Sequence, residues 1–147
     1  MIRGGKFTLC GILAAVMVFV AAFAVVAADA PETITIKAAL WPTPTKAPVV
    51  FGHKKHNVDY KIACAECHHK YEGGKNVWKE GDPVQKCEAC HTEPTIEGEN
   101  KLAPDQQKLN LKIAFHKDCQ GCHQKLKKDK PDSKAPVTCT GCHPAQK

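Results

Sequence analysis

The alternation of apolar and polar residues predicts only short elements in most of this chain. An apolar run without charged residues extends from Phe7 to Ala28, and no apolar segment of comparable length follows it. Residues Thr33–Lys37 alternate between apolar and polar side chains, as in a short strand, and Val49–Phe51 offers a partner for it. The Pro-rich connection Trp41–Pro44 fits neither a helix nor a central strand. We therefore expect a two-stranded sheet near the beginning of the folded part.

Glycine and proline divide the rest of the chain. Residues 71–83 contain paired glycines and a Gly-Asp-Pro sequence, and residues 92–104 are acidic, so that both segments are predicted loops. Pro104 and Asp105 are start signals for a helix over Asp105–Lys117, although the alternation of Leu109, Leu111, Ile113 and Phe115 is typical of a strand. Residues Lys125–Pro136 are predicted to form a lysine-rich loop.

The long apolar run has the composition of a secretory signal peptide. Arg3 and Lys6 precede it, and small residues close it at Ala27 and Ala28. An uncleaved anchor is the alternative, because the run is long enough to span a bilayer. The alanines and the polar chain that follows favour cleavage after Ala27 or Ala28. We therefore expect residues 1–28 to be a Sec-type signal peptide, and residues 29–147 to form one exported domain.

The composition of the exported part is poor for an ordinary hydrophobic core. Its only aromatic residues are Trp41, Phe51, Tyr60, Tyr71, Trp78 and Phe115. Side-chain burial alone would hardly offset the entropy lost when such a chain becomes ordered. We expect another group to fill the interior.

One motif, Cys-x-x-Cys-His, occurs four times in the exported part. The cysteine pairs are Cys64 and Cys67, Cys87 and Cys90, Cys119 and Cys122, and Cys139 and Cys142, and the histidines that follow them are His68, His91, His123 and His143. In this motif the two thiols attach to the haem vinyl groups as thioethers, and the histidine becomes an axial ligand of the iron. The sequence therefore predicts four covalently bound c-type haems.

Three other kinds of site use closely spaced cysteines. Zinc binds Cys-x-x-Cys pairs, but it does not require a histidine directly after each pair. Redox-active dithiols share the spacing, but four of them in one small chain would be unusual. A disulfide framework suits an exported chain but leaves the repeated histidine unexplained. The haem interpretation accounts for every residue of the motif, and covalent attachment of c-type haem takes place outside the cytoplasm.

The histidine count indicates how each iron would be completed. The chain has eight histidines, and the four outside the motifs are His53, His56, His69 and His116. A lone histidine is more often an ordinary surface or core residue, but four of them match four open positions. Methionine is the other common sixth ligand, and both methionines, Met1 and Met17, lie in the predicted signal peptide. We therefore expect four bis-His haems.

Spacing limits which histidine serves which haem. His69 adjoins His68 and His116 lies close to Cys119, so that neither reaches the far face of its neighbouring haem. His53 and His56 are three residues apart and could reach two different haems. Ligands that cross between haems require the four groups to be packed into one cluster, which would supply the missing core.

These residues resemble the class III cytochromes c, the tetrahaem cytochrome c3 family of sulfate-reducing bacteria. The stretch Pro48-Val49-Val50-Phe51-Gly52-His53-Lys54-Lys55-His56 is similar to the family's Val-Val-Phe-x-His-x-x-His sequence, and Cys64–His69 is similar to its Cys-x-x-Cys-His-His sequence. The resemblance implies a small irregular α+β fold of loops and short helices, with a short N-terminal two-stranded sheet, wrapped around a four-haem core.

The resemblance also implies a pairing of the ligands. His53 would pair with His68, His69 with His91, His56 with His123, and His116 with His143, while Phe51 would pack near the first two haems. One departure is that all four motifs have two residues between their cysteines, whereas many family members have four at the second and fourth haems. The departure leaves the attachment chemistry unchanged and leaves the subgroup and usual partner open.

The implied function is electron transfer without catalysis. A bis-His iron offers no position to a substrate, and ligation without methionine implies a low potential. The resemblance implies a periplasmic carrier in anaerobic sulfate respiration, which accepts electrons from a hydrogenase or dehydrogenase and passes them to membrane redox complexes. The alternative is a multihaem reductase, which would need a haem accessible to substrate.

Charge indicates where a redox partner would dock. The net charge is +6, and after residue 100 lysines outnumber acidic residues by more than two to one. Five lysines lie between the third and fourth motifs, namely Lys125, Lys127, Lys128, Lys130 and Lys134. This excess of positive charge in the C-terminal part would steer association with an acidic protein. A lysine-rich loop that serves only solubility would have the same composition. We expect an exported monomer that docks here, with no role in nucleic-acid binding.

Overall fold

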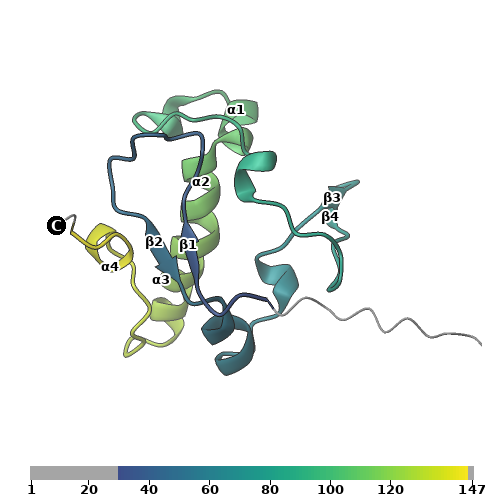
Figure 1. Cartoon of the computed structure of the whole chain (residues 1–147), viewed down its shortest axis with the longest axis vertical. Coiled ribbons are helices and arrows are strands. Elements are labelled where there is room, and N and C mark those ends of the chain that lie inside the picture. Colours follow the sequence, from purple (N-terminus) through teal and green to yellow (C-terminus); the bar gives the residue numbers. More distant parts are fainter. Residues whose placement is uncertain (1–29, 146–147) are drawn as a thin grey trace, which may run out of the picture.

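The computed structural model describes residues 30–145, which form an irregular arrangement of short strands and helices (Figure 1). The predicted signal peptide, residues 1–28, lies outside the described residues. The strands are β1 (Ile34–Ile36), β2 (Val49–Phe51), β3 (Tyr71–Glu72) and β4 (Lys75–Asn76), and the α-helices are α1 (Pro104–Leu109), α2 (Leu111–Phe115), α3 (Gly121–Asp129) and α4 (Cys139–Cys142). Tight helical turns lie at Lys55–Asp59, Cys64–Glu66, Cys87–Ala89, Glu99–Lys101 and His116–Gln120.

The predicted N-terminal sheet is confirmed. β1 and β2 pair antiparallel, with Ile34 opposite Phe51 and Ile36 opposite Val49. These four side chains are partly buried, whereas Val50 is exposed. The alternation in both strands therefore gives the sheet one apolar face.

The predicted helix over Asp105–Lys117 is present, but it is interrupted at Asn110. α1 ends there because the backbone of Asn110 is extended, with φ −74° and ψ 121°. The side chain of Asn110 is fully buried; its Oδ1 accepts from the backbone N–H of Ile113 and so caps α2. The backbone of Glu93 bonds on both sides of this break, to Leu109 and Leu111. The strand-like pairing of Glu93 with Asn110 agrees with the alternation of apolar residues that begins at Leu109.

Beyond the break, the helical backbone extends further than the sequence predicted. α2, the turn His116–Gln120 and α3 follow one another along one column (Figure 1). The prediction of a loop over Lys125–Pro136 was therefore wrong for its first part, because α3 continues to Asp129. Residues 122–129 contain neither glycine nor proline, and lysine, leucine and glutamine are good helix formers.

The prediction of a loop over residues 71–83 also missed a hairpin. β3 and β4 pair across Gly73 and Gly74, which have φ of 56° and 80°. Glycine adopts this left-handed region without steric cost, so that two strands can turn there. In Figure 1 this hairpin and α4 lie on opposite sides of the helical column.

Burial of side chains is slight throughout residues 30–145. The buried side chains there are Asn110, Leu111 and Ile113, and large apolar residues such as Tyr71 and Val84 are more than half exposed. The polypeptide's own packing therefore contributes little of the apolar burial that usually stabilises a domain of this size.

Candidate haem-binding sites

Each Cys-x-x-Cys-His motif folds as a turn of helix. In the first, second and fourth motifs the backbone N–H of the histidine donates to the carbonyl of the first cysteine, at 2.9, 2.9 and 2.7 Å. The third motif lies in the helical column, across the turn His116–Gln120 and the start of α3. Residues three and four positions apart share one face of a helical turn. Both thiols and the imidazole of a motif are therefore presented together.

The eight thiols of the motifs are free within the described residues. Burial, and then the carboxylate of Asp118, raise the pKa of Cys67 to about 11 and that of Cys119 to about 12. Burial also raises the pKa of Cys87 and Cys142. Redox-active dithiols have a lowered thiol pKa, so these environments argue against the dithiol interpretation.

Three of the free histidines lie opposite a motif histidine. The ring centroids of His53 and His68 are 6.2 Å apart, and those of both His56 and His123 and of His69 and His91 are 6.1 Å apart. Two imidazoles bound to opposite sides of one metal ion, each through a bond of about 2 Å, have ring centres about 6 Å apart. The three pairs therefore have the separation that bis-imidazole ligation requires.

The fourth free histidine, His116, is influenced by the charge of the fourth motif histidine, His143. The pKa of His116 is lowered by burial first, then by the charges of Lys112 and His143. His116 therefore lies in the electrostatic environment of His143, the histidine of the fourth motif. Burial also lowers the pKa of His68, with further contributions from His53 and His69. A lowered pKa favours the neutral imidazole, which is the form that binds a metal.

Backbone carbonyls orient several of these rings. The Nδ1 atoms of His56, His91, His123 and His143 lie 2.7–2.9 Å from the carbonyls of Gly52, Lys108, Pro136 and Ala47. Donation from Nδ1–H fixes the tautomer whose Nε2 lone pair is free to bind a metal. Ala47 lies 96 residues from His143 in the chain, so this partner could not be predicted from the sequence.

Aromatic side chains pack against the imidazoles. Trp78 lies 5.0 Å from His68 between ring centroids, and Tyr71 lies 5.4 Å from His69. Neither contact was predicted, because both depend on the β3–β4 hairpin. Phe51 contacts His53 and His56. His53 and His56 lie opposite the histidines of the first and third motifs, His68 and His123. Phe51 is therefore near the first and third haem sites, whereas the resemblance implied a place near the first and second haems.

The lysines of the predicted docking region differ in position. Lys125, Lys127 and Lys128 lie on α3, whereas Lys130 and Lys134 follow it. Lys127 is half-buried and the other four are exposed. The four exposed lysines therefore follow the third motif in the chain and precede the fourth.

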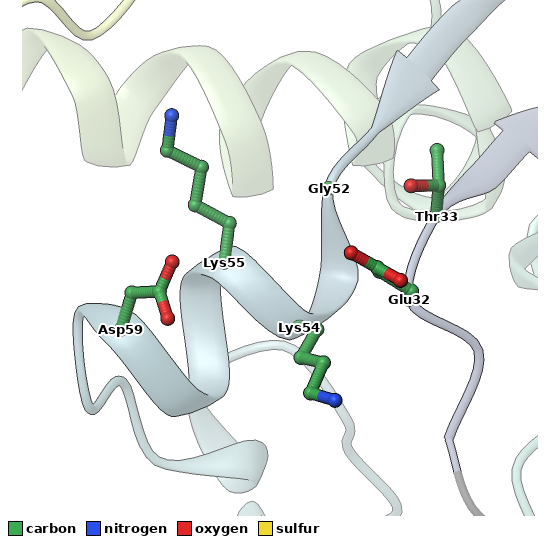
Figure 2. Close-up of a pocket in the computed structure, with 6 residues that line it drawn as sticks. All are labelled: Glu32, Thr33, Gly52, Lys54, Lys55 and Asp59. Atoms are coloured by element: carbon green, nitrogen blue, oxygen red, sulfur yellow. The ribbon is translucent and has the colours of Figure 1, made fainter.

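An open hollow of about 380 Å³ lies beside β1 and the turn after β2 (Figure 2). It is lined by Glu32, Thr33, Gly52, Lys54, Lys55 and Asp59. Figure 2 shows the side chains of Lys54 and Lys55 pointing in opposite directions. The lining includes neither cysteine nor histidine, so this hollow offers no attachment point for haem.

The donor set fits c-type haem. Each motif supplies two free thiols and an imidazole, and three motif imidazoles face a second imidazole at the separation given above. Nδ1 of His53 is buried without a hydrogen-bond partner. Within residues 30–145, no three His, Cys, Asp or Glu side chains gather as an independent metal site.

Comparison with known proteins identifies the family. Residues 26–143 match the class III cytochrome c family. The chain belongs to this family. It is 37% identical to cytochrome c3 of Desulfovibrio desulfuricans over 123 residues, which cover 79% of this chain and 97% of that protein. It is 36% identical to cytochrome c3 of Maridesulfovibrio salexigens over 125 residues, covering 81% and 99%.

Part of the chain also resembles a larger protein. It is 33% identical over 89 residues to the nine-heme cytochrome c of Desulfovibrio desulfuricans, covering 58% of this chain and 21% of that protein. The resemblance stated from the motifs is thus confirmed, and this class III cytochrome c is a multihaem electron-transfer protein that carries haem c. Within the described part, none of its helices is both long enough and apolar enough to cross a membrane.

Proposed function

We propose that this cytochrome is a low-potential electron carrier with four bis-His c-type haems. The observation that carries the proposal is the pairing of imidazoles at 6.1–6.2 Å, each pair joining a motif histidine to a free one. Haem supplies the one-electron couple when bound. The chain's residues attach it, close both faces of its iron and set its surroundings.

The proposed ligand pairs are the four that the family resemblance implied. In three of them, His53 with His68, His69 with His91, and His56 with His123, the ring centroids are separated by the distance that two imidazoles on one metal ion would have. His116 with His143 is supported by the charge of one acting on the other. Because His68 and His69 are neighbours and serve different pairs, the first and second sites are held close together.

Closed ligation determines the chemistry. Two protein imidazoles leave no position for a substrate, which favours electron transfer over the reductase alternative. Carbonyl acceptors on Nδ1 make several of the ligands more basic. Greater basicity and the absence of methionine ligation both favour the oxidised iron, and hence a low potential.

The place of action follows from the chemistry of attachment and from charge. Haem c is attached outside the cytoplasm, and the predicted signal peptide would bring the chain to the periplasm. The exposed lysines Lys125, Lys128, Lys130 and Lys134 form a basic region between the third and fourth motifs. We propose that an acidic redox protein, such as a hydrogenase, delivers electrons there for transfer to membrane complexes.

Carbon monoxide binding to the reduced protein tests the closed sites. We expect the native protein to bind no carbon monoxide. The variant His69→Ala should bind one molecule per chain, because this change opens one face of the second haem. Tyr71→Ala is the matched control, since it removes the ring packed on His69 but leaves the ligand. Binding of carbon monoxide by the native protein would instead favour the reductase.

A further inference from the structure

The ion pair between Lys112 and Glu99 differs from the others in its burial. Nζ of Lys112 lies 2.7 Å from Oε1 of Glu99, and the two side chains are only 26% and 12% exposed. Each of the other ion pairs in residues 30–145 has a side chain that is at least 68% exposed. Water screens charges less at a site of low exposure, so the Lys112–Glu99 pair acts on its neighbours more strongly.

One partner of the ion pair, Lys112, lies one helical turn before a proposed haem ligand, His116. The backbone N–H of His116 bonds to the carbonyl of Lys112, one helical turn earlier. Nζ of Lys112 also donates to the carbonyl of Ile96, so that it ties the segment before α1 to α2. Residues four positions apart lie on one face of a helix, so the side chains of Lys112 and His116 are neighbours, and Glu99 is held beside Lys112 by the ion pair. Two opposite charges of low exposure therefore act on the same imidazole.

We propose that Glu99 and Lys112 set the reduction potential of the haem bound between His116 and His143. The oxidised haem carries one more positive charge than the reduced haem. The ammonium of Lys112 therefore favours the reduced form, and the carboxylate of Glu99 favours the oxidised form. Because the pair lies one turn from His116, its effect is concentrated on this haem. This inference rests on the proposed function, since it requires His116 to be an iron ligand.

A purely structural role predicts a different result. If the pair only fixed the position of α2, removal of either partner would loosen the same contact and move the potential in the same direction. An electrostatic role gives shifts of opposite sign. Lys112→Gln lowers the potential of this haem, whereas Glu99→Gln raises it. The double variant returns it toward the native value.

The test is a redox titration of the holoprotein followed by NMR, which resolves the haems individually. We expect each single change to alter the electron-exchange equilibrium between this haem and the other three by about threefold or more, in opposite directions. The variant Lys112→Arg keeps the positive charge, and this haem should therefore keep its native potential. Shifts of equal sign, or shifts spread evenly over all haems, would overturn the inference. If a single variant fails to fold, the double variant and Lys112→Arg still test the inference, because it requires this haem to keep nearly the native potential in both.

Two exposed residues provide matched controls. Asp105→Asn and Lys101→Gln remove the same charges from solvated positions nearby, and we expect only small, even shifts from them. His116→Ala separates this inference from the proposed function. If it opens no carbon monoxide site, the ligation itself is wrong; if it opens one while the charge variants leave the potentials unchanged, only the role of the ion pair is wrong.

Discussion

The rings of His56 and His123 lie nearly parallel, with an angle of 23° between their planes, whereas those of His69 and His91 are inclined at 80°. Both pairs have the same centroid separation of 6.1 Å. If each pair holds one iron, the two irons experience ligand fields of different symmetry. Parallel imidazoles split the iron d orbitals that bond with them, whereas perpendicular imidazoles leave these orbitals nearly equal in energy.

Electron paramagnetic resonance of the oxidised protein should therefore show at least two kinds of low-spin ferric haem. We expect a rhombic signal from the His56–His123 site and a signal with one very large g value from the His69–His91 site. His69→Ala should remove the second signal and leave the first. A single uniform signal would contradict the difference in ligand orientation.

Replacement of Asn110 by alanine should destabilise the protein by about 1–3 kcal/mol. The change removes the cap of α2 and leaves the N–H of Ile113 and the carbonyl of Thr95 without this buried partner. Urea unfolding of the holoprotein measures the loss. Asn100→Ala is the control, because Asn100 is exposed. An equal loss in both variants would show that Asn110 has no special role.

The stabilising effect of the Glu99–Lys112 pair should persist under mildly acidic conditions. The hydrogen bond from Lys112, together with Glu99's own backbone N–H, lowers the pKa of Glu99 below its ordinary value of 4.5. A carboxylate with a lowered folded-state pKa stabilises the protein above its unfolded-state pKa, and the effect is lost as the pH falls through the folded-state value. The difference in Tm between the native protein and Glu99→Gln should therefore be constant down to about pH 5 and then shrink. A difference that does not shrink in stronger acid would contradict this account.

Neutralising the exposed lysines behind the third motif should slow association with an acidic redox partner. We expect the quadruple change of Lys125, Lys128, Lys130 and Lys134 to glutamine to lower the association rate by about tenfold at low salt, with a smaller effect at high salt. Stopped-flow electron transfer measures this rate. The same number of changes at lysines of the N-terminal half, namely Lys37, Lys46, Lys61 and Lys75, provides the control. Equal effects of the two sets would place docking elsewhere.

The sequence predicted the sheet and the attachment motifs because both are local. The alternation in Thr33–Lys37 gives β1, and Cys-x-x-Cys-His is a contiguous motif whose turn forms from its own backbone. The break at Asn110 could not be predicted, because Asn110 is stabilised by Thr95, fifteen residues earlier in the chain. Trp78 as a neighbour of His68, and Glu99 as the partner of Lys112, were missed for a similar reason. Their positions depend on the β3–β4 hairpin and on the loop that carries Glu99.

If all four motifs carry haem, each iron has its own pair of histidines, and the protein holds four haems. The pyridine haemochrome assay, combined with the protein concentration, gives the number of c-type haems per chain. We predict four. With three or fewer, at least one motif and its paired histidine would have another role, and the four-haem proposal would be wrong.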